Sequence, residues 1–327
     1  MTKLFGTNGI RGVVNADMNC ELAQGVGKAW GTLLRKTIKN PNVAIATDAR
    51  LSNNMLKHAI ASGFLSTGCD ISDLGVLPTP ALQYAVKKKD FDSGVIITAS
   101  HNPPQFNGIK GVDSTGTEFP KATEMEIEKI HFEEKFGMAD FKNVGSYSVW
   151  DGAVDLYIKG IFSNVDVELI REKKFHIVLD CGSGAGGVVA PCALEKLGCK
   201  LTKLYCKPDG TFPGHNSEPM PENLSELIKK VPEVHADLGV AQDGDADRAI
   251  FVDENGNYIW GDKTLSICAK YVTKGQKNSC VATPVTTSSC FDDVLKENDV
   301  RIVHTMVGSP LVARAMIENN CIFGGEE

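Results

Sequence analysis

VAIAT at residues 43–47 begins the stretch that decides the fold, because an apolar run of this length predicts a strand. A polar loop follows it, and a helical pattern then runs from Met55 to Thr67 and ends at Gly68-Cys69. A second strand pattern, DISDLG at 70–75, comes next. Strand, helix and strand in this order predict a βαβ unit with parallel strands.

The same order of patterns occurs twice more along the chain. HIVLD at 176–180 precedes a glycine-rich loop, a helical pattern and the strand pattern KLTKLYC at 200–206. SCVAT at 279–283 precedes a Thr/Ser loop, the helical pattern FDDVLKEND at 291–299 and the strand pattern VRIVHT at 300–305. Three copies of one unit predict repeated three-layer α/β domains with mixed, mostly parallel sheets.

The spacing of the copies predicts three domains, at residues 1–150, 151–256 and 257–327. NVGSYSVWDG at 143–152 is interpreted as a linker or the edge of a sheet. The chain stops at GGEE directly after the strand pattern CIFG, so we expect the third domain to be incomplete.

Composition narrows the class of protein. The 327 residues carry 34 Lys and Arg against 41 Asp and Glu, a formal net charge of −7, and 42% are hydrophobic. This balance is ordinary for a soluble globular protein and argues against a nucleic-acid partner, although an anionic substrate remains compatible with it. No apolar run approaches the roughly 18 residues of a membrane span, and the first residues do not form a secretory signal.

The ten cysteines are scattered and form no CxxC pair. A chain of this length without an export signal needs no disulfide framework, so we expect reduced core cysteines and a cytoplasmic location. A dispersed metal site built from these cysteines is the alternative.

DGDADR at 243–248 is the sharpest candidate site. Asp243, Asp245 and Asp247 alternate along a loop, where three carboxylates can converge on one hard cation such as Mg²⁺ or Ca²⁺. An EF-hand is one alternative, since Glu254 falls at its last ligand position, but Arg248 replaces the required glycine and the flanking patterns are strands. A polar hairpin without a metal is the other.

TASHNPPQFNGIK at 98–110 is the second candidate site. It follows the strand pattern GVIIT, at the end of a strand where α/β sheets place ligands. Ser100 is the candidate for phosphorylation or nucleophilic attack, and Lys110 could supply a cation or a proton. His101 is too close in sequence to form a triad with Ser100, and the GxSxG elbow of hydrolases is absent. The alternative is a purely structural turn.

Four further loops carry weaker signals. GTNGIRG at 6–12 places Arg11, whose guanidinium suits phosphate oxygens, in a glycine-rich turn. PDGTFPGHNSEP at 208–219 is interpreted as a connection between domains, and CGSGAGG at 181–187 as tight packing of a strand on a helix. The terminal GGEE could accept hydrogen bonds from sugar hydroxyls or could simply be solvated.

Together, TASHNPP…NGIK, DGDADR, PDGTFPGHN and GEE resemble the α-D-phosphohexomutase superfamily over the whole chain. The start LFGTNGIRG and the terminal GGEE are most similar to its archaeal-type phosphoglucosamine mutase branch, with phosphoglucomutase/phosphomannomutase enzymes as close relatives. The resemblance implies four domains around a central cleft, of which the first three share an α/β fold. It also implies that this chain stops within the third domain and lacks the fourth, which holds the substrate phosphate.

The resemblance assigns a role to each candidate residue. Ser100 would be the phosphoserine and, through its phosphate, a further ligand of one Mg²⁺ per chain. The remaining positions are the metal ligands Asp243, Asp245 and Asp247, the phosphate-binding Arg11 and Arg248, the proton-transferring His101 and Lys110, and the substrate-binding Glu326, Glu327 and Gly308.

The implied reaction interconverts hexose 6-phosphate and hexose 1-phosphate through a bisphosphosugar, with glucosamine phosphate as the expected substrate. Glucose or mannose phosphate remains open, because Thr47 in ATDAR (46–50) and Ser309 in TMVGSP depart from common family patterns. An aspartyl-phosphate type of phosphatase and an inactive sugar-phosphate-binding fragment are the other hypotheses. Hexose phosphates and bisphosphates are the expected partners, without nucleic acid or membrane, and the chain is expected as a monomer or a homodimer.

Overall fold

The computed structural model describes residues 3–6, 8–296 and 299–327. The chain divides into two compact units, one reaching Ala249 and including Glu254–Gly256, the other formed by Ile250–Asp253 and Asn257–Glu327. The division into domains at residues 150 and 256 stays a prediction. None of the helices in the described ranges combines the length and the apolar character that crossing a membrane requires.

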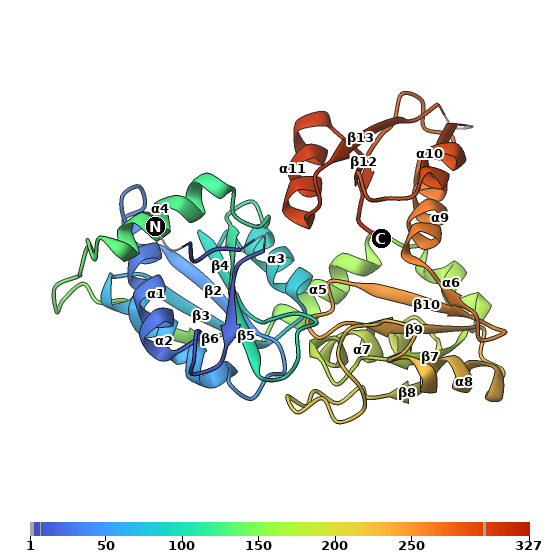
Figure 1. Ribbon diagram of the computed structural model, residues 1–327, viewed down its shortest axis with the longest axis horizontal. Coiled ribbons are helices and arrows are strands. Elements are labelled where there is room, and N and C mark those ends of the chain that lie inside the picture. Colours follow the sequence, from blue (N-terminus) through green and yellow to red (C-terminus); the bar gives the residue numbers. More distant parts are fainter. Residues whose placement is uncertain (1–2, 7, 297–298) are drawn as a thin grey trace. The chain divides into compact units, whose positions relative to one another are not determined.

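The first sheet of the larger unit has six strands in the order β1-β5-β4-β2-β3-β6 (Figure 1). Strand β2 pairs in parallel with β3 and β4, whereas β5 runs antiparallel to β4 and β1. The sheet is therefore mixed and mostly parallel in its centre, as the sequence predicts. The strand bounds are β1 Ile10–Val13, β2 Asn42–Thr47, β3 Asp70–Val76, β4 Ser93–Ile97, β5 Phe106–Asp113 and β6 Tyr147–Val149.

Helices cover both faces of this sheet. Val43 and Ile45 of β2 pack in a cluster with helices α1, α2 and α4, and the alternate residues Ala44 and Ala46 pack in a second cluster with α3 and α5. Successive strand residues point to opposite faces, so an uninterrupted apolar strand is explained by two buried faces. The helix bounds are α1 Cys20–Leu34, α2 Asn53–Ser66, α3 Thr79–Lys88, α4 Lys121–Phe132 and α5 Ala153–Phe162.

A second parallel sheet in the same unit has β7 between β8 and β9. Strand β7 is the pattern HIVLD, and its residues Ile177 and Leu179 pack in a core with Leu197 and Cys199 from the end of the following helix. The bounds are α6 Val167–Lys173, β7 His176–Asp180, the 3₁₀ turn η1 Ala185–Val188, α7 Ala190–Lys196, β8 Lys200–Leu204, α8 Ser225–Glu233 and β9 Leu238–Gln242.

The smaller unit contains a hairpin of β10 and β11 and a parallel sheet in the order β13-β12-β14. Its core joins Leu265, Ala269, Val281, Phe291 and Leu295. The predicted helix FDDVLKEND is confirmed up to Lys296, and Glu297 and Asn298 lie outside the described residues. The bounds are β10 Ala249–Asp253, β11 Tyr258–Ile259, α9 Gly261–Thr273, β12 Cys280–Pro284, α10 Ser289–Lys296, β13 Arg301–Thr305, α11 Ser309–Asn319 and β14 Phe323–Gly324.

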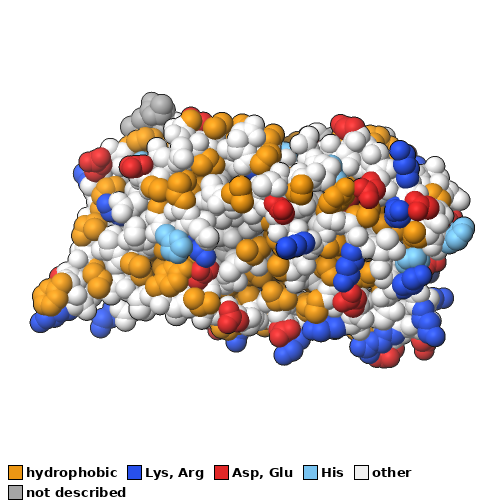
Figure 2. All heavy atoms as spheres, turned by 90° about the horizontal axis from the view of Figure 1, so that it is seen from below, with side chains coloured by type: hydrophobic (Ala, Val, Ile, Leu, Met, Phe, Trp, Pro, Cys, Tyr) orange, Lys and Arg blue, Asp and Glu red, His pale blue; other side chains and the backbone are white. Residues whose placement is uncertain are grey.

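All three predicted strand–helix–strand units are present with parallel strands, which confirms the repeated α/β architecture. The stretch 143–152 is an edge, because β6 within it pairs with the outer side of β3. The surface shown in Figure 2 mixes acidic, basic and apolar side chains.

Candidate active site

The loop that carries Ser100 leaves the carboxyl end of β4 and leads into β5. Ser100 is 1% exposed and has a φ of 53°, a left-handed conformation that non-glycine residues adopt only when their surroundings hold them there. Its N–H donates to Thr98 Oγ1 at 2.8 Å, and the N–H of Asn102 donates to the carbonyl of Ala99 at 3.1 Å. The loop is therefore a tight, buried turn around the hydroxyl.

The acidic loop follows β9 at the carboxyl end of the second sheet. Asp243 and Asp245 are fully buried, Asp247 is more exposed, and each offers a ligand oxygen within 4.8 Å of the other two. Within the described part of the chain, the buried Oδ1 of Asp245 has no hydrogen-bond partner. Three converging hard oxygens with an unsatisfied buried acceptor fit a divalent cation such as Mg²⁺.

The two loops meet. Ser100 Oγ donates a 2.8 Å hydrogen bond to Asp243 Oδ2. Lys110, 1% exposed, donates through Nζ to Asp245 Oδ2 at 2.9 Å and to Asp247 Oδ2 at 3.2 Å. The fold thus brings the predicted nucleophile, the predicted cation and all three predicted metal ligands together.

Burial and neighbouring charges shift the pKa values of Asp243 and Asp245 in opposite directions. Burial, followed by the negative charges of Asp247 and Asp245, raises the pKa of Asp243 well above its ordinary value. Burial acts in the same direction on Asp245, but the Lys110 ammonium and a hydrogen bond from Thr79 outweigh it and hold the pKa of Asp245 low. Against the same burial, the two aspartates raise the pKa of Lys110, which stays charged.

His101 and Arg248 lie beside the serine. His101 Nδ1 is 2.5 Å from an Arg248 guanidinium nitrogen and 3.4 Å from Ser100 Oγ. Burial, followed by the positive charges of Arg248 and Arg11, lowers the pKa of His101 to about 4. The imidazole is therefore neutral at pH 7 and accepts a hydrogen bond from Arg248.

Arg248 and Arg11 supply positive charge on two sides of the serine loop. Arg248 donates its backbone N–H to Asp243 Oδ1 at 3.2 Å, and its side chain lies 3.9 Å from both Asp243 and Asp247. Arg11 lies on β1 and donates to Asn102 Oδ1 at 3.0 Å. Its buried Nε has no partner among the described residues, so one donor remains for an anion. Thr7, in the same glycine-rich segment, lies outside the described residues.

The three predicted sugar-binding residues belong to the smaller unit and lie together there. The N–H of Gly308 donates to Glu326 Oε1 at 2.6 Å, and Thr287 Oγ1 donates to Glu327 Oε2 at 3.2 Å. Gly308 has a φ of 136° at the start of α11, a conformation that favours glycine. The backbone of Gly308 thus contacts the Glu326 carboxylate directly.

The sequence analysis missed several buried polar residues of the site. ATDAR was interpreted only in terms of substrate choice, yet Asp48 and Arg50 form a fully buried ion pair beneath the serine loop. Thr79, at the start of α3, donates to Asp245 Oδ2 at 2.6 Å and fixes that carboxylate. A charged pair directly after a buried strand was the available signal for Asp48 and Arg50, whereas nothing local marks Thr79.

The glycine-rich CGSGAGG packs tightly, but against the acidic loop and not as the expected contact of a strand with a helix. A Cβ on Gly184 would lie 2.5 Å from the carbonyl of Gly244, and the N–H of Ala185 donates to that carbonyl at 2.9 Å. This segment therefore supports the acidic loop from behind. No lysine or anion-cradling geometry is needed to explain its glycines.

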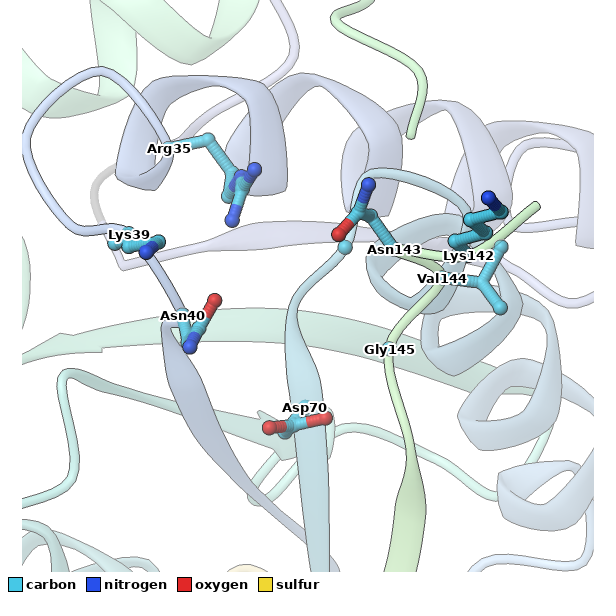
Figure 3. A pocket seen from close by; sticks show the side chains of 9 residues that line it. Arg35, Lys39, Asn40, Asp70, Lys142, Asn143, Val144 and Gly145 are labelled. Carbon is cyan, nitrogen blue, oxygen red and sulfur yellow. The ribbon is translucent and has the colours of Figure 1, made fainter. Parts of the chain in front are cut away.

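A separate polar pocket of about 220 Å³ lies where α1 and α2 end (Figure 3). Arg35, Lys39 and Asn40 lie on one side of the view, Lys142–Gly145 on the other, and Asp70 between them. None of the predicted site residues lines it.

Family models match almost the whole chain. Those for the α/β/α domains I, II and III of phosphoglucomutase/phosphomannomutase match residues 2–138, 155–256 and 260–327.

Curated relatives agree with these matches. A phosphoglucomutase/phosphomannomutase from Thermococcus kodakarensis is 44% identical over 328 residues, which cover all of this chain and 72% of the relative. A probable phosphoglucosamine mutase from Methanobrevibacter smithii is 40% identical over 99% of this chain and 69% of the relative. A phosphoglucosamine/phosphogalactosamine mutase from Sulfurisphaera tokodaii is 37% identical over all of this chain and 72% of the relative.

Solved structures show the same fold. A phosphoglucomutase/phosphomannomutase family protein from Burkholderia thailandensis superposes with a TM-score of 0.87 at 29% identity, covering 99% of this chain and 70% of the other. A putative phosphomannomutase from Thermus thermophilus superposes with a TM-score of 0.90 at 25% identity, covering 100% and 75%.

Proposed function

The chain belongs to the phosphoglucomutase/phosphomannomutase family, and from this premise we propose that it interconverts hexose 6-phosphate and hexose 1-phosphate through a phosphorylated Ser100. The observation that carries the proposal is the 2.8 Å contact between Ser100 Oγ and Asp243 in a cluster that fits a divalent cation. A hydroxyl held against such a cluster is placed to exchange a phosphoryl group.

The proposed step moves one phosphoryl group. The bond between phosphorus and Ser100 Oγ breaks as a bond from a free sugar hydroxyl to phosphorus forms, and the serine oxygen keeps the bonding electrons. The sugar then carries two phosphates, reorients, and returns the other phosphate to Ser100. Phosphoryl transfer depends on positioning and on neutralising charge, and bound Mg²⁺ would supply that neutralisation at Asp243, Asp245 and Asp247.

Residues around the serine provide the remaining functions. Arg11 and Arg248 would bind the phosphate oxygens, since one guanidinium donor of Arg11 is free in the described chain and Arg248 reaches the same loop. His101, neutral at pH 7, would accept the proton of the attacking hydroxyl. The negative charge of a seryl phosphate beside it would raise its pKa and favour this role. Lys110 would hold Asp245 ionised and assist the proton's transfer.

We propose glucosamine 6-phosphate as the substrate, since two of the three relatives above bear phosphoglucosamine mutase names. The alternative is glucose or mannose phosphate, which the name of the 44% identical relative favours. Glu326, Glu327 and Gly308 would contact the sugar hydroxyls. A sugar-phosphate-binding chain without turnover is the third alternative.

Three measurements test the proposal. Intact-mass spectrometry should show one phosphate on Ser100 that exchanges with labelled sugar bisphosphate. A chain that takes no phosphate at Ser100 would contradict the proposed mutase function. Ser100→Ala should abolish exchange, whereas an aspartyl-phosphate type of phosphatase would keep its activity. Turnover of glucosamine, glucose and mannose phosphates, measured side by side, decides the substrate.

A further inference from the structure

The side chain of Arg50 binds the backbone of the loop that carries Ser100, called the serine loop below. Its two terminal nitrogens donate to four carbonyls of the loop, those of Ser100 at 2.8 Å, Asn102 at 2.5 Å, Pro103 at 2.7 Å and Phe106 at 2.8 Å. Nε donates to Asp48, so all five N–H groups of the guanidinium are used. Four carbonyl oxygens facing one another would repel without the cation between them. The shape of the loop therefore depends on this one side chain.

Asp48 completes the network from the other side. Its Oδ2 accepts from Thr98 Oγ1 at 2.7 Å, and Thr98 Oγ1 in turn accepts from the N–H of Ser100 at 2.8 Å. Its Oδ1 accepts from the Arg50 N–H and from Asn53 Nδ2. Ser100 is thus connected to the same ion pair through both its carbonyl and its N–H, which explains how its left-handed backbone is maintained.

Arg50 is itself held by the PDGTF loop (Pro208–Phe212), for which the sequence suggested no chemistry. The Phe212 ring centre lies 5.3 Å from the guanidinium carbon, and the ring is 7% exposed. Gly210 forms a parallel bridge with Arg50. A Cβ on Gly210 would lie 2.5 Å from the carbonyl oxygen of Ala49 and the nitrogen of Leu51. Only glycine allows the two backbones this approach.

The PDGTF loop is anchored on the same scaffold as the acidic loop. The N–H of Asp209 donates to the carbonyl of Ser183 at 2.8 Å, and the neighbouring Gly184 and Ala185 pack against Gly244 of the acidic loop. The serine loop is therefore attached to the loops of the second sheet both directly and indirectly. The direct contacts are those of Ser100 with Asp243 and of His101 with Arg248, and the indirect attachment runs through Arg50 to Gly210 and Phe212.

We propose that the PDGTF loop is a positioning element for phosphoryl transfer, with Gly210 and Phe212 acting through Arg50 to fix the orientation of Ser100 toward the acidic cluster. The direct contacts hold the side chains of Ser100 and His101, whereas Arg50 holds the backbone carbonyls of the loop. The attachment through Arg50 therefore fixes the backbone from which the Ser100 hydroxyl projects. All five N–H groups of Arg50 are taken by Asp48 and the loop carbonyls, so we expect Arg50, Gly210 and Phe212 to act on the geometry of the serine and not on substrate binding. The proposal rests on the function proposed above.

The test uses the full chain and two readouts. The first is the single-turnover rate of Ser100 phosphorylation by glucose 1,6-bisphosphate with Mg²⁺, followed by intact mass. The second is amide hydrogen exchange of Asn102 and Phe106, whose N–H groups bond within the serine loop. Phe212→Leu should lower the saturating rate about tenfold and leave the half-saturating concentration unchanged, because a misplaced group loses rate and not binding. It should also speed exchange at both amides.

Matched variants separate positioning from general damage. Gly210→Ala should act in the same direction and more strongly, since its Cβ has no space. Phe212→Tyr keeps the ring over Arg50 and should restore the rate. Thr211→Ala is the control in the same loop. Thr211 is exposed and bonds only to Asp209 in the described chain, so this variant should leave both readouts unchanged.

Two results would overturn the proposal. Equal rates and equal exchange for Phe212→Leu, Gly210→Ala and Thr211→Ala would overturn the proposal. Faster exchange with an unchanged rate would overturn it too, because loosening the serine loop would then have no effect on phosphoryl transfer. If the unmodified chain takes no phosphate at Ser100, the proposed function fails, and exchange alone then decides whether the PDGTF loop fixes the serine loop.

Discussion

Ser100 Oγ and Asp243 Oδ2 are 2.8 Å apart although 143 residues separate them in the chain. The contact joins the loop after β4 to the loop after β9, so each α/β layer contributes one half of the site. Both loops leave the carboxyl ends of parallel strands, where α/β sheets bind their ligands. Lys110, His101 and Arg248 also join these two loops or the strand that follows the first of them.

Asp243→Asn should weaken binding of Mg²⁺, or of Mn²⁺ as a probe, because it removes the ligand charge beside Ser100. We expect a loss of affinity of at least about tenfold by titration calorimetry. Glu254→Gln is the matched control, an exposed acid close in sequence that should leave binding unchanged. Equal weakening by both variants would instead favour the EF-hand interpretation.

Lys110→Met should destabilise the fold, because it leaves Asp245 buried without its cation. Removing one partner of a buried ion pair typically lowers the free energy of unfolding by about 3–5 kcal/mol, measured by urea denaturation. Lys135→Met removes an exposed pair with Glu133 and should leave the free energy unchanged. A loss no greater than that of the control would show that Lys110 does not neutralise the acids.

Gly63→Ala should disrupt the packing of α1 on α2. Its Cβ would lie 2.4 Å from the carbonyl oxygen of Gln24 and 2.8 Å from the nitrogen of Lys28, where backbone cannot yield easily. Overpacking of this kind lowers the free energy of unfolding by about 1–3 kcal/mol. Gly137→Ala is the control, since its nearest neighbour is at 3.4 Å. Equal melting temperatures for the two variants would contradict the tight helix contact.

The ion pair of His215 with Asp180, at 3.1 Å, should make stability depend on pH. Burial lowers the pKa of His215, but the hydrogen bond and charge of Asp180 outweigh it and raise that pKa above 6.5. A raised pKa in the folded state stabilises the protein at low pH, and this stabilisation is lost as pH rises through the folded-state pKa.

The free energy of unfolding of the unmodified chain should therefore exceed that of His215→Gln most near pH 6, with the difference shrinking by about pH 9. Urea denaturation of both proteins across this range measures it. A difference that stays constant or grows with pH would mean that the pair carries no net charge attraction.

The strands and helices were predictable because their signals are local. VAIAT, HIVLD and SCVAT each became a parallel strand followed by the expected helix, since an apolar run buried on both faces needs only its own residues to be recognised. Asp243, Asp245 and Asp247 were recognisable for a similar reason, because their spacing within one loop already concentrates negative charge. The loop of Ser100 was visible through its prolines and its place after a strand.

Other features were not visible because they depend on segments far apart. Lys110 was expected to move a proton, and its 2.9 Å bond to Asp245 appears only when β5 packs near the acidic loop. Arg50 was not singled out in the sequence, where only Thr47 of ATDAR drew attention. Its four carbonyl partners come from a loop about 50 residues away.

By itself, the sequence determined the three α/β units, the acidic triad and the serine turn, since hydrophobic period and side-chain spacing act over a few residues. Only the tertiary structure decided which acid receives the Ser100 hydroxyl, which aspartate Lys110 keeps ionised and why PDGTF contains a glycine and a phenylalanine. These choices depend on distances of a few ångströms between packed loops, and such distances are set by the folding of the whole unit.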